Sequence, residues 1–141
     1  MPARFHEEVM GVYFDDLDSF HILHNARYLL LFERTLGAFW MEVFQGGFQD
    51  REDRFHFVRA NHIEYHQPVT GVGRVRVRVW VEQLGRTSLT FGFRVMPMDQ
   101  DTSYATGSRT FVRVDPEAHA PVPWSEAFRD KMAPWVSEDP S

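Results

Sequence analysis

Residues 25–44 constrain the fold of this chain more than any other segment, because their pattern predicts a helix that is apolar around most of its circumference. The apolar positions are Tyr28, Leu29, Leu30, Leu31, Phe32, Leu36, Phe39, Trp40, Val43 and Phe44. A helix of this kind is buried and does not lie on a surface. Since one face of a sheet covers only one side of a helix, we expect a strongly curved sheet that wraps the helix and a second subunit that closes the rest.

Strand patterns fill most of the chain around this helix. The clearest covers residues 72–84, where valines alternate with charged side chains: Val75, Val77, Val79 and Val81 against Arg74, Arg76, Arg78 and Glu82. A period of two places one side of a strand in the core and the other in water. The other predicted strands are residues 5–14, 55–66, 87–96 and 103–114, and residues 125–132 predict a short helix.

This order of elements predicts an α+β fold in a single domain over residues 1–141. A chain of 141 residues is long enough for a core of its own, which we place at about residues 5–133. A curved antiparallel sheet of about five strands would wrap one long buried helix, with a short helix near the C-terminal end. We expect the protein to form a homodimer, or a tetramer in which two dimers pair.

Composition excludes several classes of protein. Without cysteine, the chain has no disulfide, no thiolate metal site and no cysteine nucleophile. A net charge of −5 argues against nucleic acid as the partner. No run of about 18 uncharged apolar residues predicts a membrane-spanning helix. The first eight residues lack the apolar segment of a signal peptide, so we expect a cytoplasmic protein.

An acidic turn, Asp15-Asp16-Leu17-Asp18, lies shortly before the predicted long helix. The N-terminus of a helix carries roughly half a positive charge and several unpaired backbone N–H groups. A carboxylate can activate water, and free N–H groups can stabilise an oxyanion. Together, these groups are the minimal equipment for an attack on an acyl group.

Five short motifs occur in an order that is typical of one family. They are Asp16-Leu17-Asp18; Asn25, Tyr28 and Glu33 on the helix; Ile63-Glu64-Tyr65-His66-Gln67-Pro68-Val69; Leu84-Gly85-Arg86-Thr87-Ser88; and Pro121-Val122-Pro123. In these motifs the chain resembles the hotdog-fold thioesterases, specifically the 4-hydroxybenzoyl-CoA thioesterase-like group. The resemblance extends over about residues 9–132.

The resemblance implies an enzyme that hydrolyses an acyl-CoA thioester to a free acid and coenzyme A. Asp18 matches the position of the catalytic carboxylate, which acts either as a general base or as a nucleophile. The backbone N–H near Asn25 would polarise the thioester carbonyl. No metal or other cofactor is implied, and coenzyme A enters only as part of the substrate.

The remaining residues of the acidic turn and helix allow structural interpretations beside the functional ones. Asp16 is expected to form hydrogen bonds with the local backbone of the turn, and Asn25 to cap the helix with its side chain. Glu33 lies on an apolar helix, where an ionised group needs a partner. Glu33 would form a structural ion pair or hydrogen bond, or it would support the site or serve as a catalytic carboxylate from the partner's side of a shared site. Tyr28 is expected in the core.

Two histidines, His21 and His24, lie beside the acidic turn and could be metal ligands, pocket residues or structural residues. We expect no metal, since a turn gives them no defined ligand geometry. His21 also marks a departure from the family, which commonly has glycine there. Glycine adopts a positive φ at little cost and histidine does not. We therefore expect the turn and the substrate pocket to differ in shape from those of the family.

Coenzyme A carries a 3′-phosphate and a diphosphate, which need cations at a distance from the acidic turn. The candidates are Arg59, Arg76, Arg78, Arg86 and Arg109. Arg76 and Arg78 belong to the alternating strand, where they can equally well form its solvent-facing side. No glycine-rich phosphate loop is present.

Two other functions remain open from the sequence. One is an acyl-thioester hydratase or dehydratase of the same fold, in which His21 or His24 would pair with Glu33. The other is a hotdog domain that binds acyl thioesters or a protein partner without catalysis.

Overall fold

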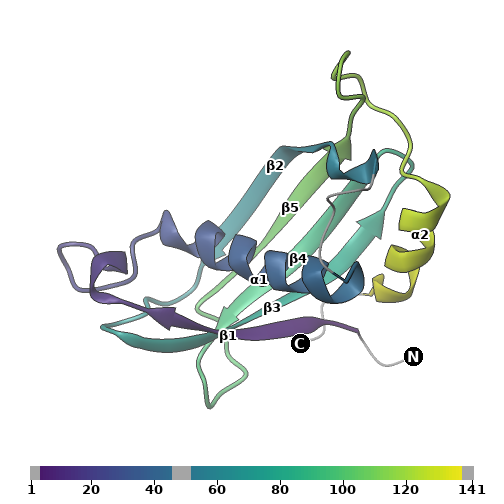
Figure 1. Ribbon diagram of the computed structural model, residues 1–141. Helices are drawn as coiled ribbons and strands as arrows, with labels where there is room; N and C mark the ends of the chain where they lie inside the picture. The colour runs from purple at the N-terminus through teal and green to yellow at the C-terminus, as the bar shows by residue number, and fades with distance from the viewer. Residues whose placement is uncertain (1–3, 46–51, 138–141) are drawn as a thin grey trace.

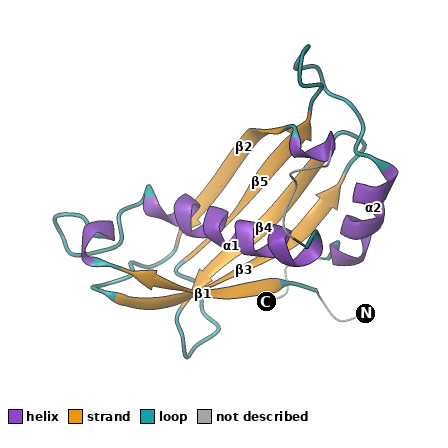
Figure 2. Cartoon of the chain, viewed as in Figure 1, coloured by secondary structure: helices purple, strands orange, loops and turns teal. Residues whose placement is uncertain are grey.

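The computed structural model describes residues 4–45 and 52–137 (Figure 1). An antiparallel five-stranded sheet has the strand order β1-β3-β4-β5-β2. Its elements are β1 (His6–Val12), α1 (Arg27–Val43), β2 (His56–Tyr65), β3 (Gly73–Leu84), β4 (Ser88–Met96), β5 (Ala105–Arg113) and α2 (Glu126–Met132). Short 3-10 helices cover Phe14–Asp16, Glu52–Arg54 and Ala133–Trp135. The curved sheet lies against α1, and α2 lies beyond the C-terminal end of α1 (Figure 2). The predicted fold and element order are confirmed.

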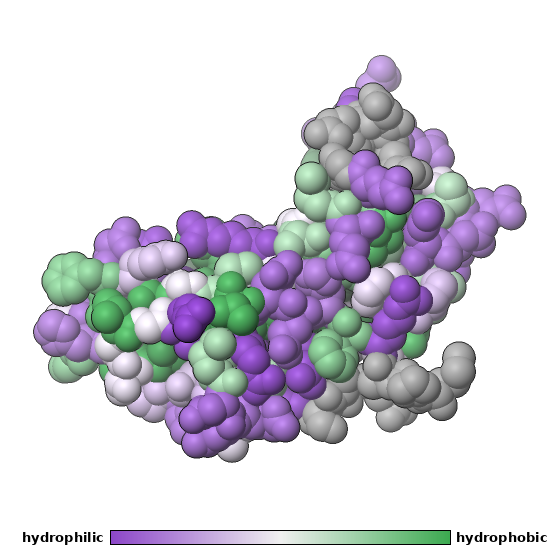
Figure 3. Space-filling model, turned by 60° about the horizontal axis from the view of Figure 1, so that its bottom comes forward, coloured by the Kyte–Doolittle hydropathy of each residue, from purple (hydrophilic) through white to green (hydrophobic). Residues whose placement is uncertain are grey.

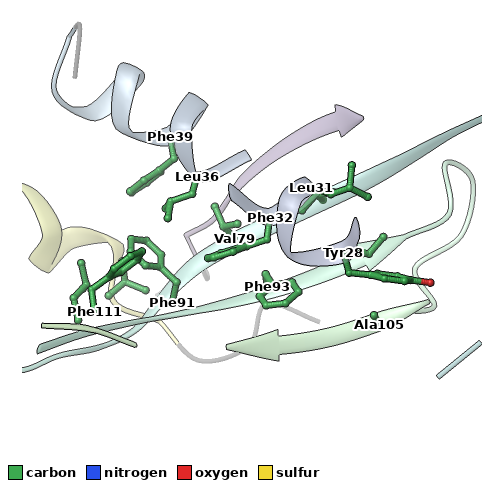
Figure 4. Close-up of a cluster of buried hydrophobic side chains, with 14 of the residues drawn as sticks. Tyr28, Leu31, Phe32, Leu36, Phe39, Val79, Phe91, Phe93, Ala105 and Phe111 are labelled. Atoms are coloured by element: carbon green, nitrogen blue, oxygen red, sulfur yellow. The ribbon is translucent and has the colours of Figure 1, made fainter. Parts of the chain in front are cut away.

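The core lies between α1 and the sheet, and aromatic side chains fill it (Figure 4). Phe32 of α1 stacks on Phe93 of β4 with 4.6 Å between ring centroids. Phe39, about two turns further along, meets Phe91 edge-on at 5.7 Å. These contacts cross the middle of the sheet, so they set the direction in which α1 runs over it.

In a single chain, the sheet buries only one side of α1. Tyr28, Leu31, Phe32, Thr35, Leu36 and Phe39 are buried against the sheet. Other residues of α1, namely Glu33, Arg34, Met41 and Glu42, are exposed. The helix is therefore not enclosed all round by its own sheet, because the sheet presents only one concave face to it.

Strand β3, which lies between β1 and β4, has the alternation that its sequence predicts. Val75, Val77, Val79 and Val81 are almost fully buried beneath α1. Strand β2 differs, since it is an edge of the sheet and most of its residues are exposed. Phe57 and Val58 keep about half of their surface exposed, at 48% each. The sheet therefore ends in a ten-residue strand whose outer backbone edge and apolar side chains are uncovered.

A buried carboxylate anchors α2 to the rest of the domain. Asp53, which is 2% exposed, accepts hydrogen bonds from the backbone N–H of Ser125 at 2.9 Å and from its hydroxyl at 2.6 Å. Ser125 in turn caps α2, because its Oγ accepts from the Phe128 N–H at 3.1 Å. This chain of bonds fixes α2 against the far end of the sheet from the acidic turn.

His21 adopts the left-handed conformation, with φ of 61°. It lies in a tight turn, where its N–H donates to the Asp18 carbonyl at 3.0 Å and its own carbonyl accepts from the Gly71 N–H at 2.9 Å. The turn thus keeps a positive φ with histidine in it, at the expense of steric strain around Cβ. The sequence correctly singled out this position as one that suits glycine.

We expect His21→Gly to raise the free energy of unfolding by about 0.5–1 kcal/mol, because the relief of the left-handed strain exceeds the entropy that glycine adds to the unfolded chain. Urea denaturation followed by circular dichroism measures the change. The matched control is His62→Gly on the exposed strand β2, which should lower stability by about 0.5–1 kcal/mol. An equal loss of stability in both variants would show that His21 is not strained in this way.

Candidate active site

A pocket of about 640 Å³ lies at the N-terminal end of α1. Its walls come from the acidic turn, the start of α1 and the end of β2, that is, Asp18, Ser19, Phe20, Ile22, Leu23, His24, Asn25, Tyr28, Tyr65, His66, Gln67 and Pro68. Two of the sequence motifs, residues 16–18 and 63–69, are thereby brought together from distant parts of the chain. The motif at 63–69 was singled out in the sequence only by resemblance, and nothing in its pattern identified Tyr65 or His66 as pocket residues.

Apolar side chains gather on the surface around this end of the molecule, at the left of Figure 3. Phe14 and Phe20, in the loop that carries the acidic turn, are 77% and 81% exposed. Phe20 also lines the pocket. The rim of the pocket can therefore contact an apolar group.

Asp18 lines the pocket and uses one carboxylate oxygen to hold its own turn. Oδ1 accepts from the Phe20 N–H at 2.8 Å and, more weakly, from the Ile22 N–H at 3.4 Å. Oδ2 has no hydrogen-bond partner among the residues that the structure describes. The turn therefore orients the carboxylate and leaves one oxygen available to a ligand or water.

Asp16 is the structural carboxylate of the turn, as the sequence predicts. It is 7% exposed, and Oδ2 accepts from the Tyr13 N–H at 2.8 Å. Oδ1 lies 3.8 Å from Arg27 Nε, and the backbone carbonyl accepts from the His24 N–H at 2.9 Å. Asp16 thus joins the end of β1 to the start of α1.

The predicted side-chain cap by Asn25 is wrong. The N-cap residue of α1 is Ala26, and no side chain caps it. Instead, His24 Nδ1 accepts from the Ala26 N–H at 3.1 Å, and the His24 carbonyl accepts from the Arg27 N–H at 2.9 Å. Because a ring nitrogen can accept only when it carries no proton, the neutral His24 ring holds its proton on Nε2. His24 thus holds the start of the helix, and its predicted supporting role in the active site stays a prediction.

Within the described part of the chain, the backbone N–H of Asn25 finds no acceptor. It lies next to the N-cap residue Ala26, near the positive end of the helix dipole, and Asn25 lines the pocket. An unpaired N–H at this place can donate to an oxygen that develops negative charge. The main-chain role predicted for Asn25 is thus compatible with the structure.

Glu33 and His21 lie outside the pocket lining. Glu33 Oε1 accepts from Arg109 Nη1 at 2.7 Å, and Arg109 Nε donates to Asn61 Oδ1 at 2.7 Å. The structural ion pair, one of the interpretations of Glu33, is therefore present.

Tyr28 is 3% exposed, and burial raises the pKa of its hydroxyl.

The candidate arginines divide into paired and exposed side chains. Arg78 Nε donates to Glu7 at 3.0 Å, and Arg76 lies 3.2 Å from Asp101 and 3.7 Å from Glu7. Arg109 is occupied by Glu33. The exposed candidates are Arg59 and Arg86, whose guanidinium groups have no ion pair within the described residues.

Residues 4–45 and 52–137 hold neither a cluster of metal-ligating side chains nor a membrane-spanning helix. No group of three histidine and carboxylate side chains there is arranged to hold a metal ion. No helix there is both long enough and apolar enough to cross a membrane.

A sequence profile of the thioesterase-like superfamily matches residues 12–132. The chain belongs to this superfamily. The match includes the acidic turn, α1 and the end of β2, so the pocket is built from the segments that the family shares. No curated protein sequence matches the chain significantly.

Solved structures have the same fold at low sequence identity. SAV2348 of Staphylococcus aureus, solved in complex with CoA, superposes with a TM-score of 0.84 at 14% identity, covering 100% of this chain and 89% of that one. A 1,4-dihydroxy-2-naphthoyl-CoA thioesterase from Synechocystis gives 0.81 at 11% identity, with 92% and 96% covered. A DHNA-CoA thioesterase from S. aureus gives 0.80 at 13%, with 92% and 89% covered. These likenesses confirm the hotdog fold.

We expect Asp16→Ala to lower the free energy of unfolding by about 2 kcal/mol, because it leaves the Tyr13 N–H without its acceptor and removes the charge beside Arg27. Urea denaturation measures the loss. Asp15→Ala, which removes an exposed carboxylate one position earlier, should change stability by less than about 0.5 kcal/mol. Similar values for the two variants would show that Asp16 is not the anchor of the turn.

Proposed function

We propose that the protein hydrolyses an acyl-CoA thioester to a carboxylic acid and coenzyme A. The observation that carries this proposal is the meeting of Asp18 and the unpaired Asn25 N–H on the wall of one pocket. Asp18 supplies a carboxylate oxygen that has no partner among the described residues. The Asn25 N–H supplies a hydrogen-bond donor near the positive end of α1. Membership in the thioesterase-like superfamily supports this chemistry.

In the proposed reaction, the thioester carbonyl oxygen accepts from the Asn25 N–H, which stabilises the negative charge that develops on that oxygen. Asp18 either takes a proton from the attacking water or attacks the carbonyl carbon itself, giving a mixed anhydride that water then hydrolyses. In both routes the C–S bond breaks and the electron pair stays on sulfur. The thiolate leaves without strong acid assistance, since the pKa of a thiol is near 8.5.

The substrate supplies coenzyme A, and the proposed reaction uses no metal or redox cofactor. The acidic turn would repel the phosphates of coenzyme A, so they should lie away from Asp18. Arg59 and Arg86 suit this purpose best, because the other candidate arginines are paired with carboxylates. The fold that this chain shares with a structure solved in complex with CoA is in keeping with such a substrate.

The hydratase alternative needs a histidine paired with a carboxylate. Glu33 was the candidate carboxylate, but it is bonded to Arg109, and His24 uses Nδ1 to hold the Ala26 N–H. Among the described residues, neither His24 nor His66 of the pocket wall is bonded to a carboxylate: His24 accepts from the Ala26 N–H, and His66 lies 2.8 Å from the Thr106 hydroxyl. Hydrolysis by Asp18 is therefore the function that this geometry favours. An assay of thioester turnover distinguishes a hydrolase from a binding domain without catalysis.

We also propose that two copies form a dimer through the free edge of β2. An exposed edge strand presents unpaired N–H and C=O groups that can pair with another strand. Strand β2 adds two half-exposed apolar side chains, Phe57 and Val58. Pairing two such edges would extend the sheet across both copies and cover these residues.

For the hydrolase, we expect Asp18→Asn to lower kcat by about a hundredfold or more, because amide oxygen neither accepts a proton readily nor attacks as a nucleophile. Thiol release from benzoyl-CoA and octanoyl-CoA measures the rates. The matched control Asp15→Asn, outside the pocket wall, should retain the native rate. Turnover by the native protein that Asp18→Asn leaves unchanged would place the chemistry elsewhere, and no turnover on either substrate would favour a binding domain.

For the dimer, the native protein should elute with twice the chain mass of 16.6 kDa in size-exclusion chromatography with light scattering. Val58→Lys should shift it to the monomer mass, since it places a charge in an apolar contact. Val72→Lys is the control, because Val72 is 64% exposed and lies outside β2. A monomeric native protein, or an unaffected Val58 variant, would contradict this interface.

A further inference from the structure

The peptide unit between Asn25 and Ala26 is held at both of its polar atoms by side chains. The Tyr65 hydroxyl donates to the Asn25 carbonyl oxygen at 3.0 Å. At the other side of the same peptide, the Ala26 N–H donates to His24 Nδ1 at 3.1 Å. Because a peptide unit is planar and rigid, bonds to both atoms fix the rotation of the whole unit.

The neighbouring peptide, between His24 and Asn25, carries the unpaired N–H of the proposed oxyanion site. Its carbonyl accepts from the Arg27 N–H at 2.9 Å. The two peptides share the Asn25 Cα atom, so once the Asn25–Ala26 unit is fixed, the neighbouring peptide can change direction only by rotation about the two single bonds at that Cα atom. Fixing the Asn25–Ala26 unit therefore also limits the direction of the Asn25 N–H.

Tyr65 is well placed to fix this unit from a distant part of the chain. It is the last residue of β2 and pairs with Ala105 of β5, so its backbone belongs to the rigid sheet. Its ring meets the ring of Tyr28 edge-on, with 5.1 Å between centroids, and Tyr28 is almost fully buried. The hydroxyl thus links the sheet to the start of α1 across forty residues of sequence.

We infer that Tyr65 is a positioning residue for the oxyanion-binding N–H: its hydroxyl holds the Asn25 carbonyl and thereby keeps the Asn25 N–H pointed at the thioester oxygen. This inference rests on the proposed function. A donor stabilises the developing charge only if it is already aimed at it, and small displacements of reacting groups cost large factors in rate. Tyr65 acts through the backbone of Asn25 and takes no proton from the substrate.

The test variant is Tyr65→Phe, which removes one oxygen atom and keeps the ring against Tyr28. We expect kcat for benzoyl-CoA or octanoyl-CoA to fall about tenfold, less than the 10²–10³ that removal of a whole oxyanion donor costs. KM should stay within about twofold, and the midpoint of thermal unfolding should not change by more than about 2 °C. The matched control is Tyr13→Phe, which removes the hydroxyl of a 63% exposed tyrosine outside the pocket wall.

A second measurement does not depend on activity. Backbone ¹⁵N relaxation of the free protein should show greater motion at the amides of Asn25 and Ala26 in Tyr65→Phe than in the native protein and Tyr13→Phe, with the middle of α1 unchanged. Unchanged amide motion would overturn the inference whatever the kinetics. Looser amides with an unchanged kcat in an active enzyme would also overturn it. If the amides loosen but the native protein hydrolyses neither thioester, the proposed function fails and the structural link between Tyr65 and Asn25 stands.

Discussion

The packing of α1 on the middle of the sheet is the interaction on which the rest of the structure depends. Phe32 and Phe39 meet Phe93 and Phe91 of β4 above a floor of buried valines from β3. Burying a large apolar side chain contributes about 2 kcal/mol, so the side chains on the buried face of α1 contribute about 10 kcal/mol together. That is comparable to the whole net stability of a domain. The same contacts set the direction of α1 and so place its N-terminus at the end of β2.

Two aspartates of the acidic turn have different roles because their surroundings differ. Asp16 is buried, and both of its carboxylate oxygens face donors of the protein, the Tyr13 N–H and Arg27. Asp18, two residues later, has one oxygen held by the turn and the other without a protein partner among the described residues. A buried carboxylate with both oxygens occupied stabilises the fold. A partly exposed carboxylate with one free oxygen can meet a substrate.

Charge pairing on the sheet explains why a row of arginines does not by itself form a phosphate site. Arg76 and Arg78 leave β3 on the side away from the core and share the carboxylate of Glu7, the residue of β1 that pairs with Arg78. Arg109 points to the helix side, where Glu33 and Asn61 take up its donors. The cross-strand partners that neutralise these cations come from other strands and from α1. The sequence of one strand shows its arginines but does not show the carboxylates that pair with them.

Local patterns in the sequence determined the elements and much of the site. The hotdog fold and the glycine-like position of His21 were predicted from the resemblance to a family, whereas the apolar helix, the alternation of Val75 to Val81 against arginines and the structural role of Asp16 follow from residues close together in the chain. Such features depend on periodicity and on backbone preferences, which act over a few residues. The pairs that meet across long distances in the chain are visible in the three-dimensional structure alone: Tyr65 with Asn25, Glu33 with Arg109 and Asp53 with Ser125. It also corrected the helix cap from Asn25 to Ala26, with His24 supplying the acceptor. These pairings depend on how the sheet curves and where α1 crosses it, and that geometry is set by the packing of the whole core.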